Sequence, residues 1–197
     1  MAVLEKERKS KNKFSYDNYC SWPDDERWEL IGGQAYNMAP APNRRHQKIL
    51  QKLSLEIGKF LEDKPCELYI APFDVRLAEK GETEKTTTNV VQPDLVVFCD
   101  EKNLDEKGAI GPPDLVIEIL SPSTAKKDQT IKYKLYERFG VKEYWVIQPE
   151  DNIVYIWNLK KTKESQEFEK SFILTEKDTA TSNVLGGLLV DLEKVLV

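Results

Sequence analysis

The sequence contains little of the chemistry on which soft-metal sites depend. It has one histidine, His46, and three cysteines, Cys20, Cys66 and Cys99. A single histidine excludes metal sites built from several imidazoles, and scattered cysteines without a C-x-x-C pair argue against a zinc-thiolate cluster. An odd number of scattered thiols is typical of a protein in a reducing cytoplasm. His46 stays open as a single participant in a site.

Long apolar runs are also missing. No window approaches the ~18 apolar residues of a membrane span, and the start, MAVLEKERKSKNK, lacks the apolar core of a secretory signal. The composition, 40% hydrophobic and 32% charged over 197 residues, is that of a soluble globular chain with a substantial core. We therefore expect a cytoplasmic protein without a membrane segment, with a flexible basic tail over residues 1–13 and a single domain over residues 14–197.

Positive charge is in short supply. The chain has 29 lysines and arginines against 34 aspartates and glutamates, a net charge of -5. Non-specific binding to nucleic acid comes from the neutralisation of phosphates by lysine and arginine. A role on nucleic acid would therefore require a local basic face, or divalent ions that supply positive charge at the site.

What the sequence does contain is a mixture of helical and strand patterns. Residues 46–61 place apolar side chains three and four positions apart, which predicts a long amphipathic helix. A second helix is expected to begin at a cap on Ser123 or Thr124 and to end near Phe139. Two short runs around Gly32 predict an N-terminal β-hairpin. The other runs with strand character are 67–78, 94–99, 114–120, 142–147 and 152–159.

These elements predict an α/β or α+β domain with a mixed central β-sheet. The two principal helices would flank this sheet and cover it. The continuous apolar runs within 95–98 and 115–120 indicate strands that are buried on both faces.

One of these apolar strands carries a charge that needs an explanation. In GPPDLVIEILSPST, residues 111–124, Glu118 interrupts an otherwise apolar run. A carboxylate inside such a strand is costly unless something neutralises it. Glu118 therefore either pairs with a buried cation or basic residue, or holds a metal ion. Asp114, which follows a proline, is more simply read as the start of the strand.

A second carboxylate can meet Glu118 from another strand. Asp114 and Glu118 share a strand face but lie roughly 13 Å apart, too far to hold one small cation. Adjacent strands are only ~4.8 Å apart, so Asp94 and Glu118 can converge on one ion if their strands are neighbours. Magnesium prefers oxygen ligands, usually one or two carboxylates together with water and substrate phosphate oxygens. Two acids on neighbouring strands fit that need.

The helix after this strand has polar residues at a spacing of four. Asp128, Lys132 and Tyr136 lie on one helical stripe. Because the loop SPST returns the chain from the end of the strand, Lys132 could reach the carboxylates, and there it would stabilise negative charge on a phosphate or orient an attacking water. The alternative is a solvated helix face with ordinary i, i+4 pairing.

Together these motifs resemble a known family. The order WELIGG, a histidine that opens the first long helix, PDLVV, PDLVIEILSPST, D-x-x-x-K-x-x-x-Y and FGVKEYWVIQP is similar to the Uma family of bacterial restriction-type endonucleases, in the PD-(D/E)-x-K nuclease superfamily. The resemblance extends over residues 16–196. It implies a restriction-endonuclease-like sheet flanked by helices, and a magnesium-dependent site that hydrolyses DNA phosphodiesters.

The resemblance also implies roles for individual residues. The catalytic set would combine two strand acids, a lysine displaced to the helix, the acid of WELIGG and the helix-opening histidine: Asp94, Glu118, Lys132, Glu29 and His46. The metal ligands would be three of these carboxylates and one strand carbonyl: Asp94, Glu118, Glu29 and Ile119. Asp128 and Tyr136 would support Lys132. Leu120 stands where the superfamily expects a lysine, so catalysis would depend on Lys132 reaching inward.

We therefore expect a DNA endonuclease that uses Mg²⁺, with Mn²⁺ as a substitute, and that forms a homodimer if it cuts two strands. Two alternatives stay open. One is a catalytically inactive nucleic-acid or protein-binding module on the nuclease fold, which the acidic net charge and Leu120 favour. The other is a hydrolase of small phosphoesters or nucleotides, which needs the same metal chemistry and differs in substrate.

Overall fold

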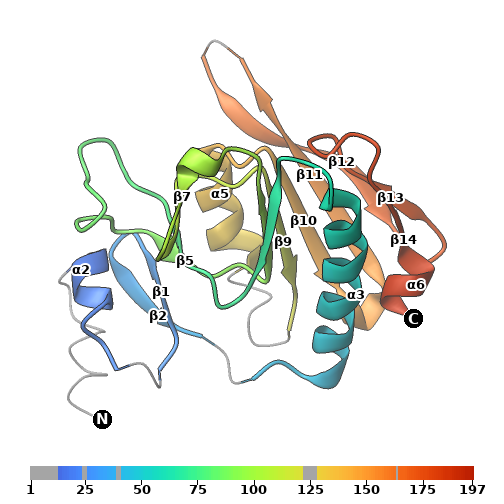
Figure 1. Cartoon of the computed structure of the whole chain (residues 1–197), viewed down its shortest axis with the longest axis horizontal. Coiled ribbons are helices and arrows are strands. Elements are labelled where there is room, and N and C mark those ends of the chain that lie inside the picture. Colours follow the sequence, from blue (N-terminus) through green and yellow to red (C-terminus); the bar gives the residue numbers. More distant parts are fainter. Residues whose placement is uncertain (1–12, 24–25, 39–40, 122–127, 163) are drawn as a thin grey trace.

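The computed structural model describes residues 13–23, 26–38, 41–121, 128–162 and 164–197 (Figure 1). Two mixed six-stranded sheets form most of this structure. A short strand pair, β13 (Thr179–Thr181) and β14 (Leu189–Asp191), lies beside the sheet that contains β9 (Leu115–Ile119), the central sheet. Within these residues no helix is long and apolar enough to span a bilayer. Residues 1–12 of the expected tail lie outside the described residues.

The central sheet has the strand order β12-β11-β10-β9-β6-β3. Its middle strand, β9 (Leu115–Ile119), runs parallel to β10 (Glu143–Gln148) and antiparallel to β6 (Leu95–Phe98). The outer strands all pair antiparallel with their neighbours: β11 (Ile153–Lys161), β12 (Gln166–Leu174) and β3 (Glu67–Ile70). The strands that carry the two predicted acids are therefore direct neighbours.

The N-terminal sheet has the order β2-β1-β5-β4-β8-β7. β1 (Trp28–Ile31) and β2 (Gln34–Asn37) form the predicted hairpin, because Gly32 and Gly33 adopt φ angles of 60° and 79° that glycine reaches without strain. The other strands are two or three residues long: β4 (Val75–Arg76), β5 (Val90–Val91), β7 (Leu104–Asp105) and β8 (Gly108–Ile110). Only residues 92–94 separate β5 from β6, so this segment joins the two sheets.

The two principal helices cover opposite faces of the central sheet. α3 (Arg44–Leu61) is the predicted amphipathic helix, and the Asn43 side chain caps it by accepting a hydrogen bond from the His46 N–H at 2.9 Å. α5 (Tyr133–Phe139) follows a π-helical turn over Asp128–Lys132 and ends at Gly140 in the left-handed conformation. The short helical segments are α2 (Tyr16–Tyr19), η1 (Glu101–Asn103), η3 (Pro149–Asp151) and α6 (Leu192–Leu196). The caps predicted at Ser123 and Thr124 lie outside the described residues.

Alternation along β9 divides the core in two. Leu115, Ile117 and Ile119 pack in the cluster that includes the apolar face of α3. Val116 packs in a second cluster with α5 and the N-terminal sheet. Every side chain of β9 is buried, as the continuous apolar run predicted. By the same alternation Glu118 points into the space between the central sheet, α5 and the N-terminal sheet.

Two details differ from the sequence-based expectations. The mixed α+β fold is confirmed, but the run 67–78 supplies a strand to each sheet, β3 and β4, with Pro72 in the break because proline has no N–H for a ladder. Cys66 and Cys99 form a disulfide rather than standing apart as unpaired thiols. They continue the β3–β6 register, in which Glu67 faces Phe98, so the pairing depends on strand register and not on sequence spacing.

A buried carboxylate on the α3 side of the central sheet helps to hold the C-terminal segment. Glu143 opens β10 with none of its surface exposed. Its Oε1 accepts a hydrogen bond from Trp145 Nε1 at 2.5 Å, and its Oε2 accepts from the N–H groups of Asn183 at 2.7 Å and Val184 at 3.1 Å. All three partners are donors, so the residue at position 143 must supply acceptors on both terminal atoms.

Glu143→Gln should lower the free energy of unfolding by about 1–3 kcal/mol, because an amide cannot accept on both atoms and leaves a buried N–H unpaired. Urea denaturation followed by circular dichroism measures the change. The matched control is Glu167→Gln on the exposed side of β12, expected within about 0.5 kcal/mol of the unaltered protein. Equal stability of both variants would show that the acceptor role of Glu143 has no weight.

Candidate functional site

Glu118 meets a lysine inside the protein. Lys132 lies at the end of the π-helical turn, and its Nζ is 2.8 Å from Glu118 Oε1 on β9. Both residues are only 3% exposed. Of the two explanations offered for a carboxylate in this strand, the structure therefore shows pairing with a buried basic residue. Lys132 does reach inward, as the sequence required.

A second carboxylate holds the same ammonium group from the other sheet. Glu29, on β1, has Oε1 at 2.8 Å from Lys132 Nζ, and its residue is fully buried. The same oxygen accepts a hydrogen bond from the N–H of Gln92 at 3.0 Å. Lys132 thus links the N-terminal sheet to the central sheet through two charge-assisted hydrogen bonds.

Tyr136, one helical turn after Lys132, completes a buried ionic cluster, which we define as Glu29, Glu118, Lys132 and Tyr136. Its hydroxyl donates to Glu118 Oε1 at 2.8 Å. Burial, followed by the negative charge of Glu118, raises the pKa of Tyr136 well above its usual value. The hydroxyl therefore stays protonated and acts as a donor that fixes Glu118. Asp128 lies in the π-helical turn, and its side chain is outside the described residues.

Asp94 lies beside this cluster at the entrance to β6. The register that pairs Leu95 with Ile117, continued by one residue, places Asp94 opposite Glu118. Residues opposed in this way have Cα atoms about 4.5–5.5 Å apart. Asp94 Oδ2 accepts a hydrogen bond from the Ile119 N–H at 2.7 Å. With a side chain that is 20% exposed, Asp94 connects the site to solvent.

His46 holds Asp94 from the first turn of α3. Its Nε2 is 3.2 Å from Asp94 Oδ2, and the residue is 6% exposed. Among the described residues, Nδ1 of His46 has no hydrogen-bond partner. His46 therefore uses one ring nitrogen on Asp94 and leaves the other, a buried polar atom, without a use in the described structure.

Asp94 and Glu118 are the carboxylates of the site that could hold a magnesium ion. No three His, Cys, Asp or Glu side chains in the described part of the chain converge as a ready-made metal site. Asp94 and Glu118 nevertheless occupy opposed backbone positions on adjacent strands, and Mg²⁺ usually binds through one or two carboxylates with water and substrate oxygens completing its shell. Glu29 pairs with Lys132, and the N–H of Ile119 donates a hydrogen bond to Asp94.

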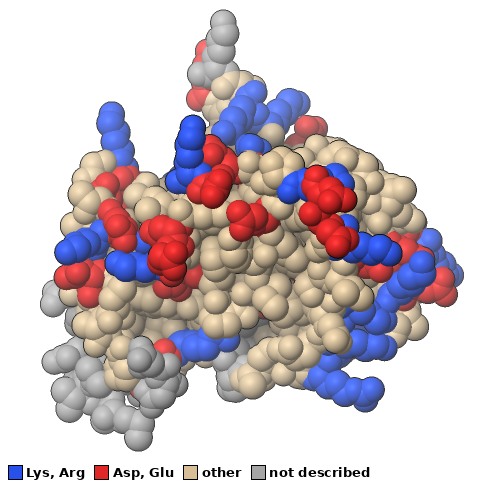
Figure 2. Space-filling view, viewed as in Figure 1, with Lys and Arg blue, Asp and Glu red and all other residues tan. Residues whose placement is uncertain are grey.

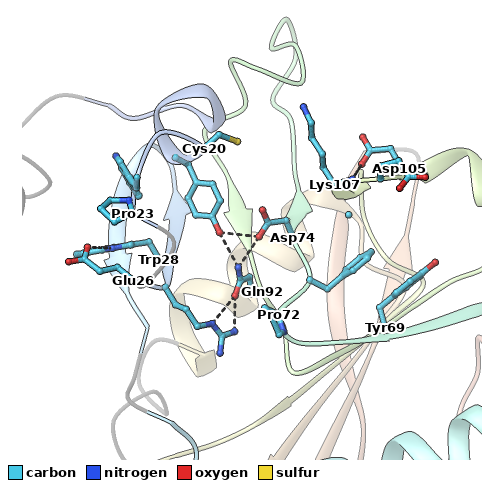
Figure 3. A pocket seen from close by; sticks show the side chains of 16 residues that line it. Cys20, Pro23, Glu26, Trp28, Tyr69, Pro72, Asp74, Gln92, Asp105 and Lys107 are labelled. Atoms are coloured by element: carbon cyan, nitrogen blue, oxygen red, sulfur yellow. Dashed lines mark hydrogen bonds between the residues drawn. The ribbon is translucent and has the colours of Figure 1, made fainter.

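A cavity of about 720 Å³ adjoins the site between α2, β1 and the segment that precedes β4 (Figure 3). Gln92 lies at its centre: Oε1 accepts from Arg27 Nη2 at 2.7 Å, and Nε2 donates to Tyr19 Oη at 3.0 Å and Asp74 Oδ1 at 2.9 Å. Burial raises the pKa of Asp74. Because the Gln92 N–H binds Glu29, one residue connects the cavity to the buried ionic cluster.

Sequence reasoning did not find this second group. Arg27, Gln92 and Asp74 come from three separate segments and match no motif at a fixed spacing. Gln92 precedes the PD pair by one position, which was its only visible mark in the sequence. Its contacts depend on the passage of the chain from one sheet to the other.

Lys132→Met should lower the free energy of unfolding at pH 8 by about 3–5 kcal/mol, because it leaves Glu29 and Glu118 as buried carboxylates without their cation. At pH 5 the loss should be smaller, because protonation of either carboxyl group removes one of the two uncompensated charges. Urea denaturation at the two pH values measures the difference.

The control for this variant is Lys134→Met, on the exposed side of the same helical segment, expected within about 0.5 kcal/mol of the unaltered protein. An equal loss at pH 5 and pH 8 for Lys132→Met would assign the effect to lost packing, and would contradict an ionic role for the lysine.

Comparison with known proteins places this geometry in context. A family profile with the description "Uma2: Putative restriction endonuclease" matches residues 16–193. A curated relative, "Uncharacterized protein slr1290" of Synechocystis sp. (strain ATCC 27184 / PCC 6803 / Kazusa), is 30% identical over 126 residues, or 63% of this chain and 62% of that protein. The aligned region thus spans less than two thirds of that relative.

A solved structure shares the fold. The crystal structure of "a putative nuclease belonging to DUF820" from Anabaena variabilis ATCC 29413 superposes with a TM-score of 0.68 at 18% sequence identity, over 93% of this chain and 97% of that chain. At this identity the likeness concerns the fold, and it agrees with a nuclease-like arrangement of the sheets and helices. Because the family profile covers most of the sequence, the chain belongs to the Uma2 family.

Proposed function

We propose that this protein hydrolyses the phosphodiester bonds of DNA with the help of Mg²⁺ held by Asp94 and Glu118. The observation that supports the proposal is the contact of a buried lysine with Glu118, opposite whose backbone position Asp94 lies on the neighbouring strand. When bound, the ion would polarise the scissile phosphate and favour ionisation of a water molecule. The family description and the fold of the solved nuclease support the same class of reaction.

The role of Lys132 is to present a fixed positive charge. Two carboxylates hold its ammonium group, each at 2.8 Å, so its position is set before any substrate arrives. A preorganised cation in a site of low polarity stabilises the charge that develops on a phosphate more strongly than a solvated lysine does.

Glu29, Tyr136 and His46 act as positioning residues in this proposal. Glu29 holds Lys132 from the N-terminal sheet, and Tyr136 fixes the orientation of Glu118. His46 and the Ile119 N–H both contact Oδ2 of Asp94, so they fix the orientation of this carboxylate. Small displacements of such groups are costly in rate, because catalysis depends on near-attack geometry.

The structure also bears on the binding-module alternative. A module that only binds nucleic acid or protein has no use for a lysine and two acids away from its surface, and burying such groups costs several kcal/mol per ion before pairing. Glu29, Glu118 and Lys132 are each at most 3% exposed. This cost favours a catalytic role for the cluster.

Asp94→Asn and Lys132→Met should each lower DNA cleavage by about 10²–10³-fold, as expected when one charged group is removed from a preorganised site. The assay uses supercoiled plasmid, linear duplex and single-stranded DNA, with Mg²⁺ or Mn²⁺ and with a chelator. Lys134→Met is the matched control and should cleave at the unaltered rate. Calorimetric titration with Mn²⁺ should show weaker binding to Asp94→Asn, which tests the metal site without reference to activity.

Other outcomes separate the alternatives. A folded, unaltered protein that binds DNA but cuts none of the three forms would be the binding module. Cleavage of bis(p-nitrophenyl) phosphate without cleavage of DNA would indicate a small phosphoester as the substrate. Sedimentation analysis with and without DNA tests whether two copies assemble to cut two strands. Full activity of Asp94→Asn would refute the proposed site.

A further inference from the structure

The first half of α3 has a charge opposite to that of the whole chain. Residues 44–52 contain four basic side chains and no acid, although the protein as a whole has a net charge of -5. We call these four residues the basic face of α3: Arg44, Arg45, Lys48 and Lys52. At 100° per residue they fall within an arc of roughly 100°, opposite the side chains that α3 buries.

This face is directed outward. Arg44, Arg45 and Lys48 are exposed, and Lys52 is partly exposed. In the space-filling view lysines and arginines gather over the lower part of α3 (Figure 2). Together with Asn152 and the C-terminal residues, three of the basic side chains line a surface hollow of about 540 Å³.

The charges on this face are crowded, and within the described ranges they have no Asp or Glu partner. No Asp or Glu side chain in the described ranges forms an ion pair with any of the four. Arg45 donates to Asn152 Oδ1 at 2.6 Å, and Lys48 donates at 2.7 Å to the main-chain oxygen of Val197, the last residue of the sequence. Burial, followed by the positive charge of Lys48, lowers the pKa of Lys52. A bound polyanion would relieve this repulsion.

The basic face begins at the same end of α3 as the candidate site. His46 belongs to the same first turn as Arg44 and Arg45, and its Nε2 lies 3.2 Å from Asp94 Oδ2. The four basic residues extend from there over about 12 Å of helix. The positive dipole end of α3 lies at the same place and adds to the attraction for anions. A strand bound along this face would therefore reach the end of α3 at which Asp94 lies, although His46 and Asp94 are on the buried side of the helix.

We propose that the basic face of α3 binds the phosphate backbone of the nucleic acid that Asp94 and Glu118 act upon. The inference rests on the proposed function for the identity of the substrate, but it concerns a separate surface. The basic face of α3 is the local positive surface that an acidic protein needs for a role on nucleic acid. Since the contacts are to phosphates, binding should be independent of base sequence and strongly dependent on salt.

The test is the salt dependence of DNA binding. Fluorescence anisotropy of a labelled 20-base-pair duplex, measured in chelator from low to moderate NaCl concentration, compares the unaltered protein with Arg44→Gln/Lys52→Gln. The negative slope of log K against log[NaCl] should be shallower by about two in the variant, one for each phosphate contact removed. At low salt the dissociation constant should rise about 10–100-fold.

The matched control is Lys102→Gln/Lys134→Gln, which changes the net charge equally at exposed positions away from α3. Its slope should match that of the unaltered protein. If both double variants lose the same slope, binding depends on net charge alone and the proposal fails. It also fails if Arg44→Gln/Lys52→Gln keeps the full slope, or if that variant loses binding to phosphatidylserine vesicles but not to DNA.

These outcomes stay separate from the proposed function. A reduced slope in Arg44→Gln/Lys52→Gln, together with an unaltered protein that cuts no DNA, would support the binding surface and refute the nuclease. Cleavage that is lost in Asp94→Asn, together with an unchanged slope in the α3 variant, would support the nuclease and refute the surface.

Discussion

The structure depends on the desolvation of one ammonium group. Lys132 is removed from water, and only the two carboxylates of Glu29 and Glu118 make that burial tolerable. Because Glu29 comes from the N-terminal sheet and Glu118 from the central sheet, this requirement fixes the two sheets and the helix between them in one arrangement. The site is therefore part of the core, where chemical function and the packing of the fold place demands on the same side chains.

Hydrophobic periodicity and the energetic cost of a buried charge predict much of this structure. The helix over α3, the hairpin at Gly32 and the buried strand around Glu118 could be predicted because each follows from spacing over a few residues. The inward position of Lys132 could be posed as a condition, because an isolated buried acid is so costly. The inward position itself depends on the tertiary structure, because the π-helical turn directs the Lys132 side chain toward Glu29 and Glu118.

The features that were not predicted depend on contacts between distant segments. The pairing of Cys66 with Cys99 follows from the register of β3 against β6. The division of residues 67–78 between two sheets follows from which neighbours each half finds. Gln92 has no local pattern, yet it connects Arg27, Tyr19 and Asp74 to Glu29. Pattern and propensity describe single elements, and these contacts exist only after the elements assemble.

The position of Lys132 on the helical segment, and not on β9, has a consequence for the order in which the buried ionic cluster assembles. Leu120 occupies the strand position and joins the apolar core, so β6 and β9 can pair without bringing any positive charge to Asp94 and Glu118. The Lys132 ammonium reaches Glu118 and Glu29 only when the helical segment that carries it packs against β9 and β1. A nascent or partly unfolded chain would thus contain the carboxylates without their lysine, and the buried ionic cluster would form only once the chain is fully folded.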